Sequence, residues 1–392
     1  MICRSSNTSA RTAGPSSRKS LFPRPAACFV GSVKARMLTS YSLYSLWRRA
    51  RTPILLSKLT HAEHVAHASG ACAESSLASP ADGYGEMGGV ARLEIALRDL
   101  TALDYPQIQN LRLGTSSWSS QDWVGVFYPP GTTSADFISE YAKHFDTVEV
   151  DSTFYRTPPA AVVRNWHART PAGFLVAAKF PQVITHEKVL VDCAHELSEF
   201  LKAMDLLGDK LGPLLLQFPY FNKKVFPHVQ DFLARLSKFL DQLRRGRAYS
   251  IELRNKYWIN DRLLDLLRAR NISLALIDHP WMTPVDQLVA KQDVVTADFA
   301  YLRWLGDRKG IEEKTKHWDR VILDRRREME TWIPIIRKLL KRGIRILGFF
   351  NNHYAGFAPG SIKLFHEVWE RMGATEEWGF RRADPHVLLP SP

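Results

Sequence analysis

Three short stretches decide the fold of this chain: TVEVDSTFY at residues 147–155, FLVAAKFP at residues 174–181 and GPLLLQFP at residues 212–219. Each has the length of a β-strand and is mainly apolar. Longer segments lie between the stretches and after the last one. Strands that alternate with helices in this way predict βα units on a parallel sheet.

Five further stretches of the same kind bring the predicted strands to eight: LRLGTSSW from Leu111, AYSIELRN from Ala248, SLALIDH from Ser273, VVTADFAYLRWLG from Val294 and IRILGFFNN from Ile344. Apolar residues spaced three and four apart predict helices around Phe137–Phe145, Phe200–Leu207, Phe232–Phe239, Leu263–Leu267 and Trp332–Leu340, and SIKLFHEVWERMG supplies a closing helix. Eight such units over about 260 residues predict an α/β fold, a TIM-type (β/α)8 barrel. An open doubly wound sheet would carry a Gly-rich first turn, but the first turn here reads GTSSWSSQDW.

The formal net charge of +13 lies mostly in residues 1–62. That segment holds eleven of the 53 Lys and Arg residues and no Asp or Glu, so the other 42 basic residues nearly balance the 40 acidic ones. A nearly neutral barrel argues against a broad phosphate-binding face. Nucleic acid is therefore a less favoured partner than a small molecule.

The domain organisation follows from this composition. Residues 1–62 form a basic, disordered extension without an apolar run long enough to cross a bilayer, so no membrane association is expected. The extension resembles a mitochondrial transit peptide, with a basic amphipathic helix at Met37–Lys58; the alternatives are a solvated tail or a start at Met37. The expected location is mitochondrial or cytoplasmic. Residues 63–108 form a linker with a helix at Val90–Leu103, and residues 109–385 form the barrel.

Cysteine usage sets a further limit. Cys3, Cys28 and Cys72 precede the barrel, and Cys193 alone lies within it. A disulfide or a cysteine-based metal site inside the barrel is thereby excluded. We interpret Cys193 as an ordinary buried thiol and not as a nucleophile.

Polar side chains follow the predicted strands at their carboxyl ends, where barrel enzymes hold their catalytic groups. A buried charge is costly unless it is paired, which makes these charges candidates for chemistry. The alternative is a salt-bridge network that closes the top of the barrel. The candidate catalytic residues are Glu149, Asp151, Lys179, Glu252, Arg254 and Asp278.

Candidate ligand-binding residues lie at the same strand ends. Tryptophans there suit sugar rings, nucleobases or other flat ligands, although each could equally pack between loops and helices; they are Trp118, Trp258, Trp281 and Trp304. Glycines before a helix that starts near Ser361 predict an anion site, with a plain helix cap as the alternative. The polar candidates are Gln217, Arg303, Asn351, Asn352, His353, Gly360 and Ser361.

Taken together, these motifs resemble the domain-of-unknown-function 72 family, the YecE-like proteins. The resemblance rests on GTSSWSSQDWVGVFYP, YAKHFDTVEVDSTFYRTP, FLVAAKFPQVITHEKVL, LLLQFP, IELRNKYW, YLRWLG and FFNNHYAGFAPGS, in this order over roughly residues 111–366. It implies a TIM-type barrel and no established activity. The family pattern has Asn where this chain has Asp151, which adds a carboxylate to the pocket.

The function expected from the residues is an enzyme, a hydrolase, lyase or isomerase, acting on a sugar or phosphorylated metabolite, with Glu252 or Glu149 as general acid or base. Gln217 and Arg303 stand where retaining glycosidases of this fold usually place carboxylates, which disfavours that subclass. For Lys179, an ion pair is favoured over a Schiff base. No cofactor is required by the sequence.

Two other functions stay open. The first is a metal-dependent hydrolase or isomerase using oxygen ligands from Glu149, Asp151, Glu252 and Asp278 with the imidazole of His353. No short metal motif supports that choice, and we assign no residue to a metal. The second is a non-catalytic barrel that binds nucleic acid or another ligand. The oligomeric state is not indicated by the sequence.

Overall fold

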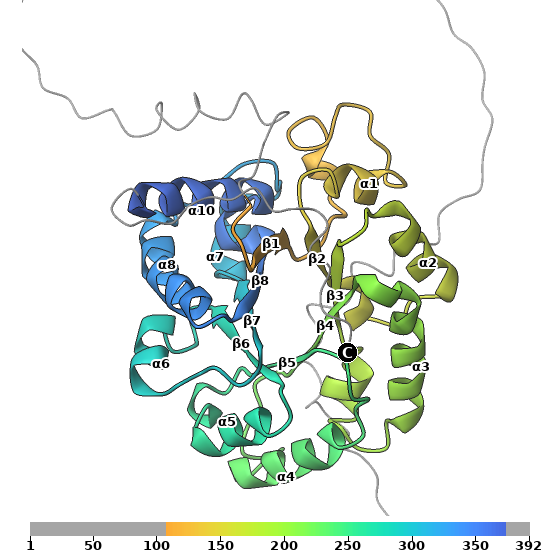
Figure 1. The fold of residues 1–392 in the computed structure, drawn as a ribbon, viewed down its shortest axis with the longest axis vertical. Helices are drawn as coiled ribbons and strands as arrows, with labels where there is room; N and C mark the ends of the chain where they lie inside the picture. The colour runs from red at the N-terminus through yellow and green to blue at the C-terminus, as the bar shows by residue number, and fades with distance from the viewer. Residues whose placement is uncertain (1–106, 374–392) are drawn as a thin grey trace, which may run out of the picture. The chain divides into compact units, whose positions relative to one another are not determined.

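The computed structural model describes residues 107–373, and the extension and linker, including the predicted helices at Met37–Lys58 and Val90–Leu103, lie outside the described residues. Eight parallel strands form one nearly closed barrel in the order β1-β8-β7-β6-β5-β4-β3-β2, which confirms the predicted fold (Figure 1). The strands are β1 (Leu111–Thr115), β2 (Thr147–Val150), β3 (Leu175–Lys179), β4 (Leu211–Gln217), β5 (Tyr249–Glu252), β6 (Ser273–Asp278), β7 (Phe299–Trp304) and β8 (Arg345–Phe350).

Helices surround the strands (Figure 1). They are α1 (Phe137–Tyr141), α2 (Ala160–Arg169), α3 (Ala194–Met204), α4 (Val229–Leu240), α5 (Asp261–Arg268), α6 (Val285–Lys291), α7 (Arg308–Glu312), α8 (Arg326–Lys341), α9 (Asn352–Ala355) and α10 (Ala358–Gly373). Short turns of helix add η4 (Gln121–Trp123), η5 (Ser152–Phe154), η6 (Val183–Glu187), η7 (Asp205–Lys210) and η8 (Lys256–Trp258). Within the described residues, none of these helices is long and apolar enough to cross a membrane.

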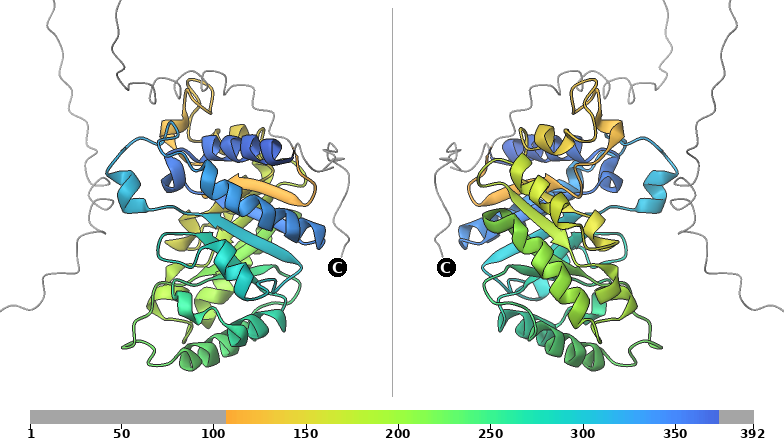
Figure 2. Two further views of the ribbon diagram at one scale, coloured as in Figure 1. Left: turned by 90° about the vertical axis from the view of Figure 1, so that its left-hand side faces the viewer. Right: turned by 90° about the vertical axis from the view of Figure 1, so that its right-hand side faces the viewer.

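The helices that the sequence pattern predicted between the strands and after the last strand are present, and α2, α6, α7 and α9 are additions. Helix α2 buries only Val163 and Trp166, and α6 has seven residues, so neither carries a sustained apolar stripe. In both views of Figure 2, α7, which follows β7, stands out from one side of the barrel.

Tyr141 bridges the gap between β1 and β2, which are not neighbours in the hydrogen-bonded order of the sheet. Its hydroxyl accepts a hydrogen bond from the backbone N–H of Thr115 at 2.8 Å and donates to the backbone carbonyl of Thr147 at 3.1 Å. Gly114 allows this approach, because a Cβ atom there would lie 2.2 Å from the carbonyl oxygen of Thr147.

Residues of each strand alternate between two apolar cores. The larger core packs the strands against the helices, whereas a smaller core lies inside the barrel and includes Ala177, Leu215, Ile277, Tyr301 and Phe349. Because successive strand side chains point to opposite faces, a side chain two positions beyond one of these inner residues also faces the interior. This alternation decides which strand-end residues reach the site.

Candidate functional site

Arg303 lies at the centre of a buried cluster inside the barrel. Its guanidinium group donates to Glu149 from Nε at 2.8 Å and from Nη2 at 2.7 Å, and Nη1 donates to Glu252. The Tyr301 hydroxyl donates to the same Glu149 carboxylate at 2.7 Å. The side chains of Glu149 and Glu252 are 0% exposed and that of Arg303 is 1% exposed, so we call these four residues the floor.

Pairing keeps both glutamates of the floor ionised. Burial alone would raise the pKa of Glu252, but the charges of Arg254, Arg303 and Lys179 outweigh that effect and lower its pKa to about 2. The pKa of Glu149 is lowered in the same way by Arg303 and Lys179, against the effect of burial. Two buried carboxylates in contact with one guanidinium form the salt-bridge network considered as an alternative for these residues.

Above the floor, the charged groups keep contact with solvent. Lys179 pairs with Asp151 at 2.6 Å, and their side chains are 12% and 32% exposed. Arg254, which is 22% exposed, pairs with the Glu252 carboxylate at 2.6 Å and so links the floor to the charged groups above it. Partial burial raises the pKa of Asp151, and the positive charge of Lys179 opposes this rise. The ion pair predicted for Lys179 is confirmed.

Two histidines complete what we call the mouth: Asp151, Lys179, Arg254, His186 and His279. Burial lowers the pKa of His186 to about 4, with further lowering by the charges of Lys179 and Arg254. Burial and Arg254 lower the pKa of His279 to about 4 as well. Both imidazoles are therefore neutral near pH 7 and can donate one hydrogen bond and accept another.

Neither histidine was among the candidate site residues, although the sequence places His279 directly after Asp278 at the end of the sixth strand. His279 lies two residues beyond the inner residue Ile277, and this alternation favours it over Asp278. His186 lies in η6, a π-helical turn, where its ring pairs with the Thr185 hydroxyl at 2.8 Å. No regular spacing in the sequence marks such a turn.

Asp278 does not join the cluster. It lies one position away from Ile277, on the outer side of β6, and accepts a hydrogen bond from the Trp332 indole at 3.0 Å. Trp304 also faces outward, where it is fully buried and stacks on Phe350. Gln217, by contrast, faces the interior two residues beyond Leu215, and its amide donates to the Phe218 carbonyl.

A polar cavity of about 160 Å³ opens beside Asp151, between the ends of β1 and β8. Ser116 and Trp123 line it from the segment that follows β1, and the predicted residues Asn351, Asn352 and His353 line it from the segment that follows β8. We call it the serine pocket; its wall consists of Thr115, Ser116, Ser117, Ser119, Ser120, Trp123, Asp151, Trp318, Phe350, Asn351, Asn352, His353 and Ala358. The serines and Trp318 were missed by sequence reasoning, which treated GTSSWSSQDW only as a turn.

The anion site predicted at Gly360 and Ser361 is not formed. Helix α10 begins at Ala358, whose N–H is capped by the side chain of Asn352 at 2.9 Å. Ser361 is fully buried and donates to the Phe357 carbonyl, and a Cβ atom on Gly360 would meet the Phe357 ring at 2.7 Å. Arg303, a predicted ligand-binding residue, is enclosed in the floor by Glu149 and Glu252.

The predicted aromatic rim is present only in part. Trp281 is 78% exposed, but Trp258 stacks on Phe221 and Trp118 packs edge-on against Trp166. Three exposed tyrosines that were not predicted for the rim lie on the segments after β2, β4 and β5; they are Tyr155, Tyr220 and Tyr257. The exposed rings on these segments are thus mostly tyrosines.

The oxygen and imidazole ligands suggested for a metal are not gathered. Glu149 and Glu252 are both paired with Arg303, while Asp278 faces the helices. Among residues 107–373, no group of three or more His, Cys, Asp or Glu side chains is placed to hold a metal ion. The single cysteine in this part of the chain, Cys193, is buried and unbonded, as expected.

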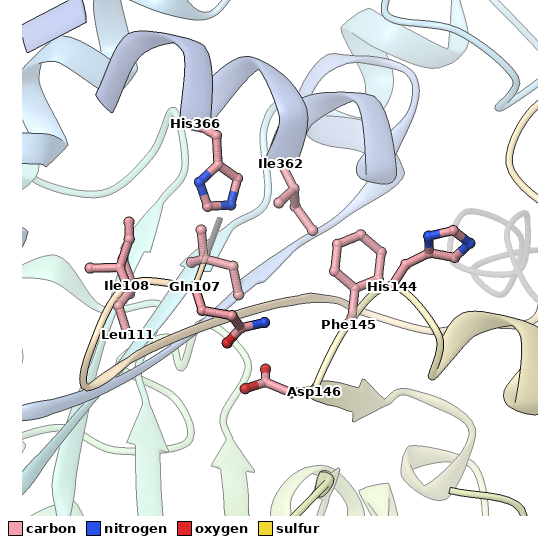
Figure 3. A pocket seen from close by; sticks show the side chains of 9 residues that line it. Gln107, Ile108, Leu111, His144, Phe145, Asp146, Ile362 and His366 are labelled. Carbon is pink, nitrogen blue, oxygen red and sulfur yellow. The ribbon is translucent and has the colours of Figure 1, made fainter. Parts of the chain in front are cut away.

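A second small cavity lies at the amino ends of β1 and β2 (Figure 3). It is lined by Ile108, Leu111, Asp146 and Ile362 among others, and its volume of about 20 Å³ is close to that of a single water site. Asp146 also pairs with Arg112 at 3.4 Å. The carboxyl end of the barrel is therefore the better place for a ligand.

The comparison with known families agrees with the fold and with the sequence motifs. The family described as "Protein of unknown function DUF72" matches residues 112–382. The chain belongs to this DUF72 family. The UPF0759 protein YecE of Escherichia coli strain K12 is 34% identical over 144 residues, which are 36% of this chain and about half (48%) of the relative's length. The UPF0759 protein YunF of Bacillus subtilis is 26% identical over 275 residues, covering 65% of this chain and 93% of YunF.

Solved structures of DUF72 proteins share the barrel. A DUF72 family protein of Thermotoga maritima is 23% identical with a TM-score of 0.50, and the match covers 67% of this chain and 98% of that one. A DUF72 family protein of Enterococcus faecalis is 22% identical with a TM-score of 0.51, covering 70% and 99%. At this level of identity the likeness establishes the fold.

Proposed function

We propose that this DUF72 barrel is an enzyme that acts on a small polar ligand by acid–base chemistry at the carboxyl ends of its strands. The observation that carries the proposal is the Asp151–Lys179 pair, which is 2.6 Å long and stays partly exposed above a fully buried floor. Its partial exposure leaves this pair open to a ligand, whereas the enclosed pairs of the floor are not. Asp151 also lines a cavity, so a ligand there would touch its carboxylate.

Asp151 is the proton acceptor in this proposal. Its raised pKa makes it a stronger base than an ordinary aspartate, and Lys179 holds it in place as a carboxylate. Arg254 provides a fixed positive charge that stabilises negative charge developing on the ligand. The neutral imidazoles of His186 and His279 add hydrogen bonds that can donate or accept.

Glu149 and Glu252 take a different role from the one expected from sequence. Both are enclosed and paired with Arg303, so neither reaches a ligand. They act as positioning residues: Glu252 holds Arg254, and Glu149 holds Arg303 below the mouth. A hydrolase, a lyase or an isomerase can each use such an arrangement, and none of these steps calls for a Schiff base on Lys179.

Proton transfer to and from carbon provides a test that requires no known product. The full chain is incubated in D2O with sugars, sugar phosphates and hydroxy acids, and ¹H NMR follows the loss of C–H signals and the appearance of products. We expect Asp151→Asn to slow any reaction found by about 100-fold or more, which is typical of a lost general base. Asp209→Asn, an exposed aspartate in η7, is the matched control and should react like the wild type.

Equal rates for Asp151→Asn and the wild type would contradict the role of Asp151. A reaction abolished by a chelator and restored by Mg²⁺ or Mn²⁺ would favour the metal-dependent alternative. Binding of oligonucleotides without turnover of any compound would favour the non-catalytic barrel.

A further inference from the structure

We infer that the serine pocket binds a neutral polyhydroxylated ring, a sugar or cyclic polyol, and not the phosphate or carboxylate of an anionic metabolite. The inference rests on the proposed function, because it assigns the substrate class of the same site. It starts from two buried donors. Ser116 is 8% exposed and Trp123 is 1% exposed; both line the pocket, and neither the Ser116 hydroxyl nor the Trp123 indole N–H has a hydrogen-bond partner.

Unpartnered buried donors are uncommon in folded proteins because leaving one unsatisfied costs about 1–3 kcal/mol. A ligand oxygen in the pocket would satisfy both groups. Asn351 and Asn352 of the pocket wall provide further hydrogen-bond donors. The Asn351 side-chain oxygen accepts from the N–H of His353 and the Asn352 oxygen from that of Ala358, which leaves the NH2 group of each amide to donate to a ligand.

The backbone of the segment after β1 is held in an uncommon conformation at Ser117. Ser117 has a φ angle of 142°, in the region that residues other than glycine rarely adopt. Its hydroxyl accepts from the N–H of Ser119 at 3.0 Å, which fixes the turn that carries the serines. Strain of this kind is retained mainly where surrounding structure or function requires it.

Charge decides between a neutral and an anionic ligand. Asp151 is the one charged residue in the pocket wall. The other titratable wall residue, His353, has its pKa lowered by burial and by Arg308, while Glu312 opposes this from 3.3 Å, and the imidazole is neutral near pH 7. From the surrounding elements, Lys179 and Arg303 face Asp151, but Lys179 pairs with it and Arg303 is 1% exposed. The wall thus offers an anion no free cation, and its carboxylate repels one.

A sugar ring meets each of these features. Its hydroxyl oxygens accept from Ser116 and Trp123, and one hydroxyl donates to Asp151, whose ionised carboxylate accepts hydrogen bonds and cannot donate one. The indole of Trp318 lies edge-on to the His353 ring and supplies a flat apolar wall. The volume of about 160 Å³ is close to that of an engineered cavity of about 150 Å³ that holds benzene, a six-membered ring.

Equilibrium binding to the full chain tests this inference by ligand-observed NMR with matched pairs, such as glucose with glucose 6-phosphate and inositol with inositol phosphate. We expect the neutral member of at least one pair to bind, and its phosphate to bind at least tenfold more weakly. Trp123→Phe removes the N–H but keeps a ring, and Ser116→Ala removes only the hydroxyl. Each should weaken binding about three- to tenfold, the effect of one hydrogen bond. Trp369 lies in the C-terminal half of α10, and Trp369→Phe is the control variant, which should bind like the wild type.

Tighter binding of the phosphate than of its neutral partner would overturn the inference, and so would wild-type affinity in both Trp123→Phe and Ser116→Ala. Ser116→Ala keeps the test decisive if Trp123→Phe does not fold. The outcomes also separate the inference from the proposed function. Binding of a neutral ring without any turnover would leave the inference standing and contradict the enzyme. Turnover of an anionic substrate that depends on Asp151 would do the reverse.

Discussion

The floor and the mouth of the barrel contain ion pairs of nearly equal length in different surroundings. Arg303 and Glu149 lie 2.7 Å apart with 1% and 0% of their side chains exposed, whereas Lys179 and Asp151 lie 2.6 Å apart with 12% and 32% exposed. The distance between the charged groups therefore does not separate the enclosed pair from the pair that is proposed to act on a ligand. In the floor every charge is enclosed by its partners, and removing one partner leaves a charge without solvation. In the mouth, water or a ligand can replace a partner.

The largest expected effect is on the floor. Arg303→Met removes the cation that both buried glutamates share, so we expect the free energy of unfolding to fall by about 3–5 kcal/mol, as for other broken buried ion pairs. Urea unfolding followed by circular dichroism measures the change. Arg254→Met, which removes a partly exposed partner of the same Glu252, should cost less. If both variants lost the same stability, the distinction between floor and mouth would fail.

The second largest expected effect is a loss of folding stability in acid, through protonation of Glu252 in the floor. The pKa of Glu252 is lowered to about 2 in the folded chain, against an ordinary value of 4.5. A carboxyl group with a lowered pKa stabilises the fold above its unfolded pKa and loses that contribution as pH falls through the folded value. We expect Glu252 to contribute about 3 kcal/mol at pH 7, lost between about pH 4.5 and pH 2.

Glu252→Gln provides the comparison for this prediction. Unfolding curves of the variant and the wild type should converge as the pH falls from 5 to 2, because the variant has no carboxyl group to protonate at that position. A stability difference that stays constant over this range would show that Glu252 is not held ionised by its neighbours.

Much of this arrangement could be predicted from the sequence, for a physical reason. Barrel strands alternate between two faces, and charged residues at strand ends such as Glu149 and Arg303 stand out in apolar runs. The same alternation, applied strictly, would have removed Asp278, which lies one residue away from the inner Ile277. The serine pocket was harder to foresee. It depends on how the segment after β1 meets the segment after β8, and contacts between such distant segments leave no spacing in the sequence.

The sequence also could not show which carboxylates are accessible to a ligand. Glu149 and Asp151 are two residues apart and both face the interior, so the alternation along the strand does not distinguish them. Their depths differ because β2 ends at Val150 and Asp151 lies just beyond the strand. The proposed role of general base therefore moves from the glutamates expected from sequence to Asp151 only once the depth of each side chain is known.

The mouth should tolerate the loss of a cation. We expect Lys179→Met to reduce the free energy of unfolding by about 1 kcal/mol or less, because the partly exposed Asp151 can be solvated or protonated once its partner is gone. The pKa of Asp151 should rise further in this variant, since the charge of Lys179 opposes the effect of burial more strongly than that of Arg303 does. NMR titration of the Asp151 carboxyl carbon measures the rise. A loss as large as that of Arg303→Met would place Lys179 in the floor.

The smallest effect is expected at the exposed aromatic ring of Trp281. This side chain is 78% exposed and touches the His279 ring edge-on, so Trp281→Ala should change the free energy of unfolding by no more than about 0.5 kcal/mol. The measurement is the same urea titration as for the floor variants, which puts both ends of the comparison on one scale. A loss above about 1 kcal/mol would mean that the ring packs against the loops around it. In that case the histidine beside it would be covered, and the segment after β6 would close over the mouth instead of leaving it open to a ligand.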